Sequence, residues 1–339
     1  MKKALITGVT GQDGAYLANL LLNKGYIVYG TRRRSSTSNT WRLQHLGVLD
    51  NPKFKIKVSD VTDLGDNIRL LENCEPDEVY NLAAQSFVET SFQQPHLTAE
   101  ITALGSLTIL EAIRIVNKKI RFYQASSSEM FGKVKETPQS ETTDFYPRSP
   151  YAVSKLFAHW STINYRESFD IFATCGILFN HESPLRGEEF VTKKITRGLS
   201  RIKMDKQEVL YLGNLNAKRD WGHAKDYVEA MWKMLQKKSP DDYVISTGKQ
   251  FTVKQFVNLV LNELNIKYKW KGKGIKEKCF DQNGNCIVAC DKEYFRPLEV
   301  DTLLGNSRKA KKELNWQPKT SIKKLVSEMV NFDLKKLTK

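Results

Sequence analysis

Ala4-Leu5-Ile6-Thr7-Gly8-Val9-Thr10-Gly11-Gln12-Asp13-Gly14, near the amino terminus, has the pattern of a strand, a tight turn and the start of a helix. The first four residues are a short apolar run, and Gly14–Asn23 carries Leu17, Leu20 and Leu21 at helical spacing. Glycines in such a turn let the chain bend sharply and let a pyrophosphate approach the positive end of the helix. The spacing is GxxGxxG, and its position between strand and helix predicts a dinucleotide site.

The alternation of strand and helix continues for about half of the chain. Further strands are predicted at Tyr26–Gly30, Phe54–Val58, Glu78–Leu82, Arg121–Ala125 and Ile171–Leu178, and long helices at Leu97–Asn117 and Tyr151–Ser168. This order predicts an α/β fold, a doubly wound parallel (Rossmann) sheet that binds ligands at the carboxyl ends of its strands.

The rhythm breaks after about residue 179, where an irregular loop at Asn180–Gly187 follows the last predicted strand. We therefore predict a Rossmann domain over 1–179 with a returning segment at about 221–250. A smaller, discontinuous α/β substrate domain is expected over 180–220 and 251–339. Its last helix is Ser321–Leu334, with Pro318 ahead of it as a start signal.

Composition limits the class of protein. The 339 residues are 40% hydrophobic and 27% charged, which is typical of an ordinary globular protein. The chain has no uncharged apolar stretch of about 18 residues, so we expect no membrane span. Its five scattered cysteines favour a reducing compartment over a disulfide framework. We expect a cytoplasmic enzyme.

Three of the cysteines, Cys279, Cys286 and Cys290, lie close together in the sequence. Their spacing lacks a CxxC unit, and no histidine lies nearby, so we predict no metal site. The residues between the first two, Asp281–Asn285, contain Asn-Gly and are better interpreted as a turn that joins two short strands.

The formal net charge of +15 raises the possibility of a nucleic-acid partner. Much of this charge is lysine spread over amphipathic segments, and the chain lacks a basic tail, zinc-finger spacing and an aromatic RNA-binding signature. We expect a basic surface that attracts a polyanionic small substrate, and no nucleic acid.

The predicted second strand is followed by Arg33, Arg34, Ser35 and Ser36, where NAD-binding chains usually carry a carboxylate for the ribose diol. Guanidinium and hydroxyl groups suit a 2′-phosphate, so NADP is the favoured cofactor. Small residues end the fourth strand, as close approach of a cofactor requires. The predicted cofactor-binding residues are Gly8, Val9, Thr10, Gly11, Gln12, Asp13, Gly14, Arg33, Arg34, Ser35, Ser36, Asp63, Leu64, Leu82, Ala83, Ala84, Gln85 and Ser86.

Four residues form the predicted catalytic set: Ser127, Glu129, Tyr151 and Lys155. The tyrosine and the lysine are four apart, so on a helix both side chains project from one face. A lysine cation beside the phenol is expected to lower its pKa, which makes Tyr151 a plausible general base. An alcohol oxidation needs one proton acceptor, whereas an elimination needs a second group, and Glu129 can be that group.

With these motifs in place, the chain resembles the extended short-chain dehydrogenase/reductases. Three longer segments, Phe179–Ile195, Leu212–Tyr227 and Tyr294–Asp301, resemble the GDP-mannose 4,6-dehydratase family within that class. The resemblance covers nearly the whole chain. It implies a lyase (hydro-lyase) that converts GDP-D-mannose to GDP-4-dehydro-6-deoxy-D-mannose and water, the first step towards GDP-fucose and related sugars.

The resemblance also implies roles for individual residues. Tyr151 would take the proton of the 4-hydroxyl, Lys155 would hold the cofactor ribose, and Ser127 would hydrogen-bond the C4 oxygen. Glu129 would remove the C5 proton during an internal hydride transfer from C4 to C6 through bound NADP. His181 and Arg186 would face the cofactor, and the smaller domain would bind the GDP-sugar. The implied substrate-binding residues are Asn180, Val191, Lys194, Arg219, Arg296 and Glu299.

Alternatives remain at this point. A nucleotide-sugar 4-reductase or epimerase shares the glycines and the Tyr-Lys pair but needs no carboxylate at Glu129. A non-catalytic basic binding protein on the same scaffold is the other alternative, and a secondary 4-keto reductase activity is also compatible. Relatives assemble as homodimers or homotetramers, and the segment Thr31–Thr40 with Trp41 and Arg42 would suit contact with a neighbour's cofactor.

Overall fold

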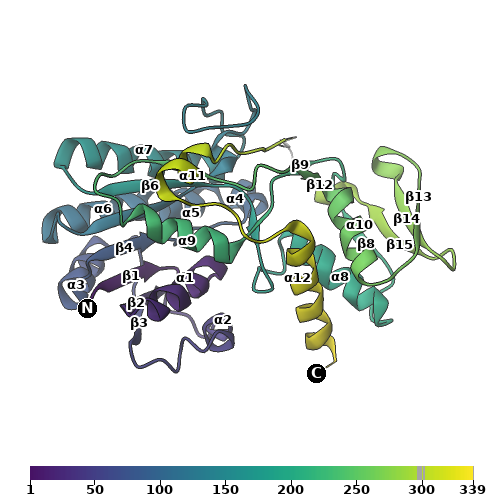
Figure 1. The fold of residues 1–339 in the computed structure, drawn as a ribbon, viewed down its shortest axis with the longest axis horizontal. Coiled ribbons are helices and arrows are strands. Elements are labelled where there is room, and N and C mark those ends of the chain that lie inside the picture. Colours follow the sequence, from purple (N-terminus) through teal and green to yellow (C-terminus); the bar gives the residue numbers. More distant parts are fainter. Residues whose placement is uncertain (296–299, 301, 339) are drawn as a thin grey trace.

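The computed structural model describes residues 1–295, 300 and 302–338. Its larger lobe is built on a seven-stranded sheet in which every neighbouring pair is parallel (Figure 1). The strands across the sheet are β11 (Tyr243–Ile245), β6 (Ala173–Leu178), β5 (Arg121–Ser127), β4 (Glu78–Asn81), β1 (Lys3–Thr7), β2 (Ile27–Arg32) and β3 (Phe54–Val58). Reversal of the strand order at β1 is the doubly wound arrangement, so the predicted fold class is confirmed.

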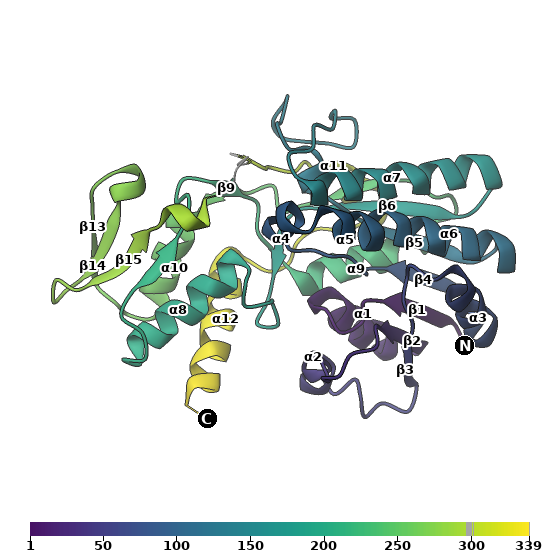
Figure 2. The ribbon, with the colours of Figure 1, turned by 180° about the vertical axis from the view of Figure 1, so that it is seen from behind.

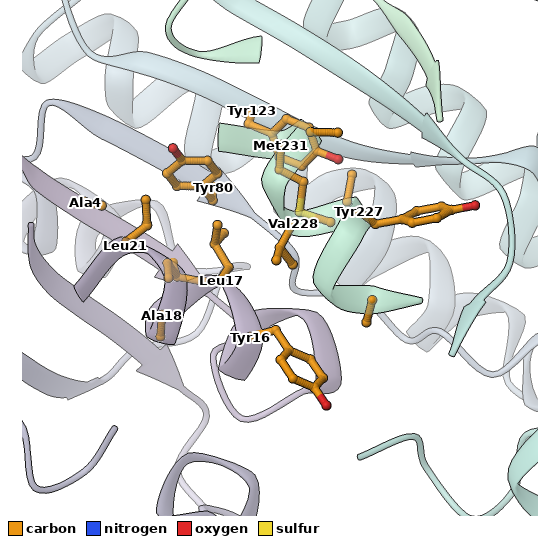
Figure 3. Packing of buried hydrophobic residues seen from close by; sticks show 14 of the residues in the cluster. Ala4, Tyr16, Leu17, Ala18, Leu21, Tyr80, Tyr123, Tyr227, Val228 and Met231 are labelled. Atoms are coloured by element: carbon orange, nitrogen blue, oxygen red, sulfur yellow. The ribbon is translucent and has the colours of Figure 1, made fainter. Parts of the chain in front are cut away.

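Helices cover both faces of this sheet (Figures 1 and 2). One layer holds α1 (Gln12–Asn23), α9 (Ala224–Met234) and α11 (Arg308–Leu314), and the other holds α3 (Leu64–Cys74), α6 (Gly105–Val116) and α7 (Pro150–Phe169). Figure 3 shows Leu17 and Leu21 of α1 beside Val228 and Met231 of α9, all fully or almost fully buried. Burying the apolar stripe of each helix against the strands removes it from water and orients the helix ends.

The predicted long helix from Leu97 to Asn117 is interrupted. It consists of α5 (Pro95–Ala99), a π-helical turn η1 (Glu100–Leu104) and α6. Within this turn the Thr102 hydroxyl accepts the backbone N–H of Gln85 at 3.1 Å. This contact joins segments far apart in the chain, so no local sequence pattern could have indicated it.

The smaller lobe is built on a four-stranded sheet, and the helices α8 (Val191–Lys203), α10 (Val253–Glu263) and α12 (Ile322–Leu337) share its core. The strands in order are β13 (Tyr268–Lys271), β14 (Lys278–Asp281), β15 (Cys286–Cys290) and β8 (Leu210–Leu212). Between β14 and β15 the chain makes the predicted turn, in which Asp281 Oδ1 accepts the N–H groups of Asn283 and Asn285. In the described part of the chain, no three His, Cys, Asp or Glu residues are grouped as metal ligands.

Segments beyond residue 220 return to the larger lobe. β11 joins the sheet, and Trp316, which follows α11, is buried and donates its indole N–H to Asp226 O at 2.7 Å. The division into domains at residues 1–179 with about 221–250, and 180–220 with 251–339, stays a prediction. Among the helices that the structure describes, none is long and apolar enough to cross a membrane.

Candidate active site

A cleft of about 720 Å³ receives side chains from both lobes. The carboxyl ends of β1, β4, β5 and β6 supply one wall, and α8, β8 and β9 (Lys218–Arg219) supply the other. This is where a doubly wound sheet is expected to bind its ligand. In Figure 2 the same ends of the strands face the smaller lobe.

The glycine loop lines this cleft where α1 begins. Gly8 has φ +65°, and a Cβ there would lie 3.1 Å from the Ala83 backbone, so the residue suits only glycine. A Cβ at Gly14 would lie 2.6 Å from Gly8 O, because helix and loop pack directly on one another. A Cβ at Gly11 would meet only Gly8 O, at 3.3 Å, so its open side faces the cleft. The loop thus leaves room for a phosphate group at the helix start.

All four predicted catalytic residues line the cleft. Ser127 ends β5, and Glu129 follows in the 3₁₀ turn η2 (Ser128–Met130), where its N–H donates to Ser127 Oγ at 3.2 Å. Tyr151 and Lys155 lie on the first turns of α7, which begins after Ser149, a residue whose side chain caps the Ala152 N–H. Two short-range signals, a strand end and a helix cap, therefore bring the set together.

The pKa of Tyr151 is raised in this structure, not lowered as predicted. Burial raises the pKa of Tyr151 to about 12, and the Glu129 charge adds to this, while a hydrogen bond with Ser127 opposes it. Lys155 Nζ lies 5.9 Å from the ring centroid and donates to Ala125 O at 2.7 Å. Burial also lowers the pKa of Lys155 to about 8. Removal from water outweighs charge pairing for both groups.

The segment after β6 carries the predicted cofactor and substrate contacts. Asn180, His181 and Arg186 all line the cleft. Asn180 Oδ1 is buried and has no hydrogen-bond partner among the described residues. Arg186 Nε lies 3.0 Å from Glu182 Oε2, and its guanidinium lies 3.5 Å from the centre of the Phe190 ring.

The implied substrate-binding residues divide into two groups. Val191, Lys194 and Arg219 line the cleft from the smaller lobe, whereas Arg296 and Glu299 lie outside the described residues. Lys194 Nζ lies 3.2 Å from the centre of the Tyr294 ring. The Arg219 guanidinium donates to Val300 O at 2.6 Å and to Lys218 O at 3.0 Å, so it is held by backbone carbonyls.

Several predicted cofactor residues are not part of the cleft lining in the described chain. Arg33, Arg34, Ser35 and Ser36 are exposed after β2. Asp63 caps α3 through the Asp66 N–H at 2.8 Å, and Leu64 is exposed. Val9 is buried in the core, and Thr10, Ala83 and Gln85 lie immediately beside lining residues. The remaining predicted cofactor residues, namely Gly8, Gly11, Gln12, Asp13, Gly14, Leu82, Ala84, Ser86, Lys155, His181 and Arg186, line the cleft.

The sequence reasoning missed the aromatic residues of the cleft. Phe87, before α4 (Val88–Gln93), meets Phe190, before α8, edge to face with 5.6 Å between ring centroids. Tyr294 and Trp221 line the smaller lobe's side. Isolated aromatic residues are far more often core than site residues, so only their neighbours in space identify them as cleft residues.

A glycine loop and a Ser-Tyr-Lys set at the carboxyl ends of a doubly wound sheet define the extended short-chain dehydrogenase/reductases. Comparison with solved structures agrees with this fold. UDP-glucose 4-epimerase from Thermotoga maritima superposes with a TM-score of 0.82 at 24% identity, covering 99% of both chains. dTDP-glucose 4,6-dehydratase from Bacillus anthracis, in complex with NAD, superposes with a TM-score of 0.81 at 20% identity, covering 99% of this chain and 97% of its own. At this identity the likeness shows the fold alone.

Sequence comparison is more specific. The family profile described as GDP-mannose 4,6 dehydratase matches residues 5–329. GDP-mannose 4,6 dehydratase 2 of Caenorhabditis elegans is 54% identical over 98% of this chain and 89% of its own. The human GDP-mannose 4,6 dehydratase is 48% identical over 98% of this chain and 91% of its own. The chain belongs to the GDP-mannose 4,6-dehydratase family.

Proposed function

We propose that this chain dehydrates GDP-D-mannose to GDP-4-dehydro-6-deoxy-D-mannose by internal hydride transfer from C4 to C6 with bound NADP. The observation that carries the proposal is the convergence of Ser127, Glu129, Tyr151 and Lys155 in the cleft that the glycine loop also lines. A buried carboxylate beside the hydroxyl pair supplies the second proton acceptor that an elimination needs and a simple alcohol oxidation does not.

Two features of the structure suit a nicotinamide dinucleotide. The open side of Gly11 leaves space for a pyrophosphate at the start of α1. At the ends of β2 and β3, Arg32 Nε and Ser59 Oγ are buried without hydrogen-bond partners among the described residues. A donor and a hydroxyl beside the exposed Arg33–Ser36 suit an additional phosphate, which favours NADP over NAD. When bound, the cofactor accepts the hydride from C4 and returns it to C6.

The side chains of this protein handle the protons. Tyr151 takes the proton of the 4-hydroxyl and, because burial holds its pKa at about 12, it needs a neighbouring cation to act as a base near neutral pH. Lys155 and Arg186 are the nearby cations of the cleft. Ser127 holds the C4 oxygen, and Glu129 removes the C5 proton that the C4 ketone has made acidic. The 6-hydroxyl takes up a proton and leaves as water, and C5 regains a proton when the hydride has been returned to C6.

We propose that the sugar nucleotide lies against the smaller lobe. Asn180 presents a buried amide oxygen that lacks a partner in the described chain, and Lys194 presents an ammonium to the cleft. Arg219 places a guanidinium, a group that suits a diphosphate, at the cleft, where two backbone carbonyls fix its position. By family resemblance, Arg296 and Glu299 would complete the diphosphate and guanine contacts. The predicted domain division, 1–179 with about 221–250 against the remainder, is kept as part of this proposal.

Incubation with GDP-mannose labelled with deuterium at C4, in the presence of catalytic NADP⁺, tests the activity. We expect a product lighter by one water in mass spectrometry, with the deuterium recovered at C6. A matched Tyr151→Phe protein should give no product, whereas Tyr146→Phe, which changes an exposed tyrosine, should behave as wild type. Recovery of a sugar that has not lost water would instead indicate an epimerase, and stoichiometric consumption of NADPH in a parallel incubation that contains it would indicate a reductase.

We also propose that the protein is a homodimer or a homotetramer. An exposed apolar face on α7 contains Val153, Phe157 and Trp160, which are 54%, 42% and 55% exposed and lie on one helical stripe. Leu97 and Leu104 of the adjacent α5 and η1 extend it. Apolar area of this kind is typical of a protein interface. Arg42 donates to Leu185 O and Thr10 O of its own chain. Contact of Thr31–Thr40, Trp41 and Arg42 with a neighbour's cofactor stays a prediction.

The remaining parts of the proposal concern the cell. Free cysteines, of which Cys74, Cys175 and Cys279 are buried, favour a cytoplasmic location. The product would supply enzymes that make GDP-fucose and other GDP-6-deoxyhexoses. A secondary reduction of the 4-keto product would appear in the same mass spectrum as a gain of two hydrogens when NADPH is in excess.

A further inference from the structure

The His181 ring lies between two hydrogen-bond acceptors. Nδ1 is 2.7 Å from the carbonyl oxygen of Phe179, and Nε2 is 2.6 Å from Asp13 Oδ2. A carbonyl can only accept, so Nδ1 carries a proton. A carboxylate likewise only accepts, so an ionised Asp13 requires a proton on Nε2 as well. With both contacts made, the ring is an imidazolium.

Asp13 places a carboxylate beside the expected position of the phosphate group. It lies in the first turn of α1, where an anionic ligand would bind, and a free negative charge there would repel that ligand. Both carboxylate oxygens of Asp13 have hydrogen-bond partners within the protein: Oδ2 faces His181, and Oδ1 accepts the Gln12 side-chain N–H at 3.0 Å. His181 thereby compensates the carboxylate, and both side chains line the cleft beside Gly11.

Further contacts fix the ring and its backbone. Gln12 Nε2 donates to the carbonyl oxygen of His181 at 3.1 Å, and Ser183 Oγ donates to Gln12 Oε1 at 2.7 Å. The His181 ring stacks on Tyr227 of α9, with 4.6 Å between centroids and an angle of 25°. The start of α1 and the segment that carries Asn180 and Arg186 are therefore fastened together at several atoms.

We propose that Asp13 is a positioning residue that holds His181 as an imidazolium in the cleft, so that its positive charge serves the diphosphate of the dinucleotide cofactor. The inference rests on the proposed function only in assuming a nicotinamide dinucleotide. Asp13 acts through His181, and the sequence motif that contains it gives no sign of a partner 168 residues away.

The charged and titratable groups around His181 come from four elements. Asp13 on α1 raises the pKa of the ring, whereas burial and Arg186 of its own segment oppose this; the net direction is upward. Glu182 follows His181 in the chain and pairs with Arg186. Tyr227 of α9 is neutral because burial raises its pKa. The charge of Asp13 also acts on Lys155 of α7, whose pKa it raises against the effect of burial. Removing the carboxylate leaves burial and Arg186, which disfavour the imidazolium, against the hydrogen bond to the Phe179 carbonyl, which favours it.

The test compares NADP⁺ affinity of the full-length protein at pH 6 and pH 8 for wild type, Asp13→Asn, His181→Gln and the double variant. Wild-type affinity should change between pH 6 and pH 8 no more than that of His181→Gln does, because His181 keeps its proton and any shared change comes from other cleft groups such as Lys155. Asp13→Asn should lose about tenfold in affinity between pH 6 and pH 8, as the ring loses its proton. Adding Asp13→Asn to His181→Gln should not change the NADP⁺ affinity or its pH dependence any further. The control Asp144→Asn removes an exposed carboxylate paired with Lys135 and should match wild type.

An Asp13→Asn protein with the wild-type pH profile, or one whose effect persists undiminished beside His181→Gln, would overturn the proposal. Nitrogen-15 NMR of the wild-type protein gives a measurement that does not depend on cofactor binding. The His181 signals, assigned by their loss in His181→Gln, should be those of an imidazolium at pH 7.5, and neutral-ring signals there would contradict us. None of these measurements uses GDP-mannose, so their outcome is independent of whether the protein carries out the proposed dehydration.

Discussion

At the scale of single residues, the cleft derives its chemistry from burial. Tyr151 and Lys155 are both nearly inaccessible to water, and each is pushed toward its neutral form. The protein thus holds the Tyr151 phenol and the Lys155 amine in the same cleft with little contact to water. A charged ligand that binds there can then change their protonation states. Such a site is costly to fold and useful once a ligand is bound.

Lys155→Met should stabilise the cofactor-free protein while abolishing catalysis. The pKa of Lys155 is about 8 in the folded protein against 10.5 for the free side chain, so the unfolded chain binds more protons between these values. Wild-type stability therefore rises with pH across that window. We expect the variant to be more stable by about 1–3 kcal/mol at pH 7, with a difference that shrinks from pH 8 to pH 10.5. Urea unfolding at several pH values measures this. A variant that is less stable at every pH would refute the argument.

Glu129→Gln should lower kcat by about 10²–10⁴ while KM for GDP-mannose changes only a few-fold. The substituted amide would keep the shape of the side chain but could not accept the C5 proton. Steady-state kinetics with Glu167→Gln as the control, an exposed residue on α7, provides the comparison. An unchanged kcat would remove Glu129 from the proton chemistry.

At the scale of elements, the contact between α8 and α12 contains a buried ion pair. Lys193 Nζ lies 2.5 Å from Asp333 Oδ1, and Thr196 donates its hydroxyl to the other carboxylate oxygen at 2.7 Å. Lys193 also donates to Pro184 O at 3.0 Å, so the pair ties α12 to the loop that carries Arg186. Helix α12 thereby supports the wall of the cleft although it does not line it.

Asp333→Ala should destabilise the protein by about 3–5 kcal/mol, because Lys193 would remain buried without its partner. Replacing both residues, as Lys193→Met with Asp333→Leu, should restore much of this loss, since no unpaired charge is then buried. Chemical denaturation of the three proteins gives the free energies of unfolding. A double variant as unstable as the single one would show that packing, and not the unpaired charge, causes the loss.

At the scale of the whole molecule, the two lobes contribute different parts of one site. The larger lobe brings the glycine loop and the catalytic set, and the smaller lobe brings Lys194, Arg219 and Tyr294. The contact between Phe87 and Phe190 joins the lobes across the cleft. Assembly of copies would add a further level through the apolar face on α7.

Trp160→Glu should convert the protein to monomers at concentrations where wild type sediments as a dimer or tetramer. The charge would have to be buried without a partner at the centre of the proposed interface. Tyr211→Glu, which changes another exposed aromatic residue on the smaller lobe, is the control and should leave the assembly unchanged. Sedimentation velocity distinguishes these outcomes, and a wild-type monomer would refute the proposed interface.

Most of the larger lobe could be predicted because its signals are local. The glycine loop, the strand end at Ser127 and the helix start before Tyr151 each depend on residues within a few positions of one another. The same reasoning failed where distant segments act. It did not foresee the π-helical turn η1, in which the Thr102 hydroxyl accepts the Gln85 N–H. It also did not foresee that Asp63, whose cofactor role stays a prediction, caps α3.

The amino-acid sequence alone determined the sheet, the glycine loop and the presence of a Tyr-Lys pair on one helical face, since spacing along the chain is enough for each. Only the tertiary structure decided the charge states. The pKa of Tyr151 rises, against prediction, because chain segments far apart in sequence enclose it. The pairing of Asp13 with His181 likewise exists only once β7 (His181–Glu182) lies against the start of α1. Desolvation is a property of what surrounds a group in space, and spacing along the chain does not specify it.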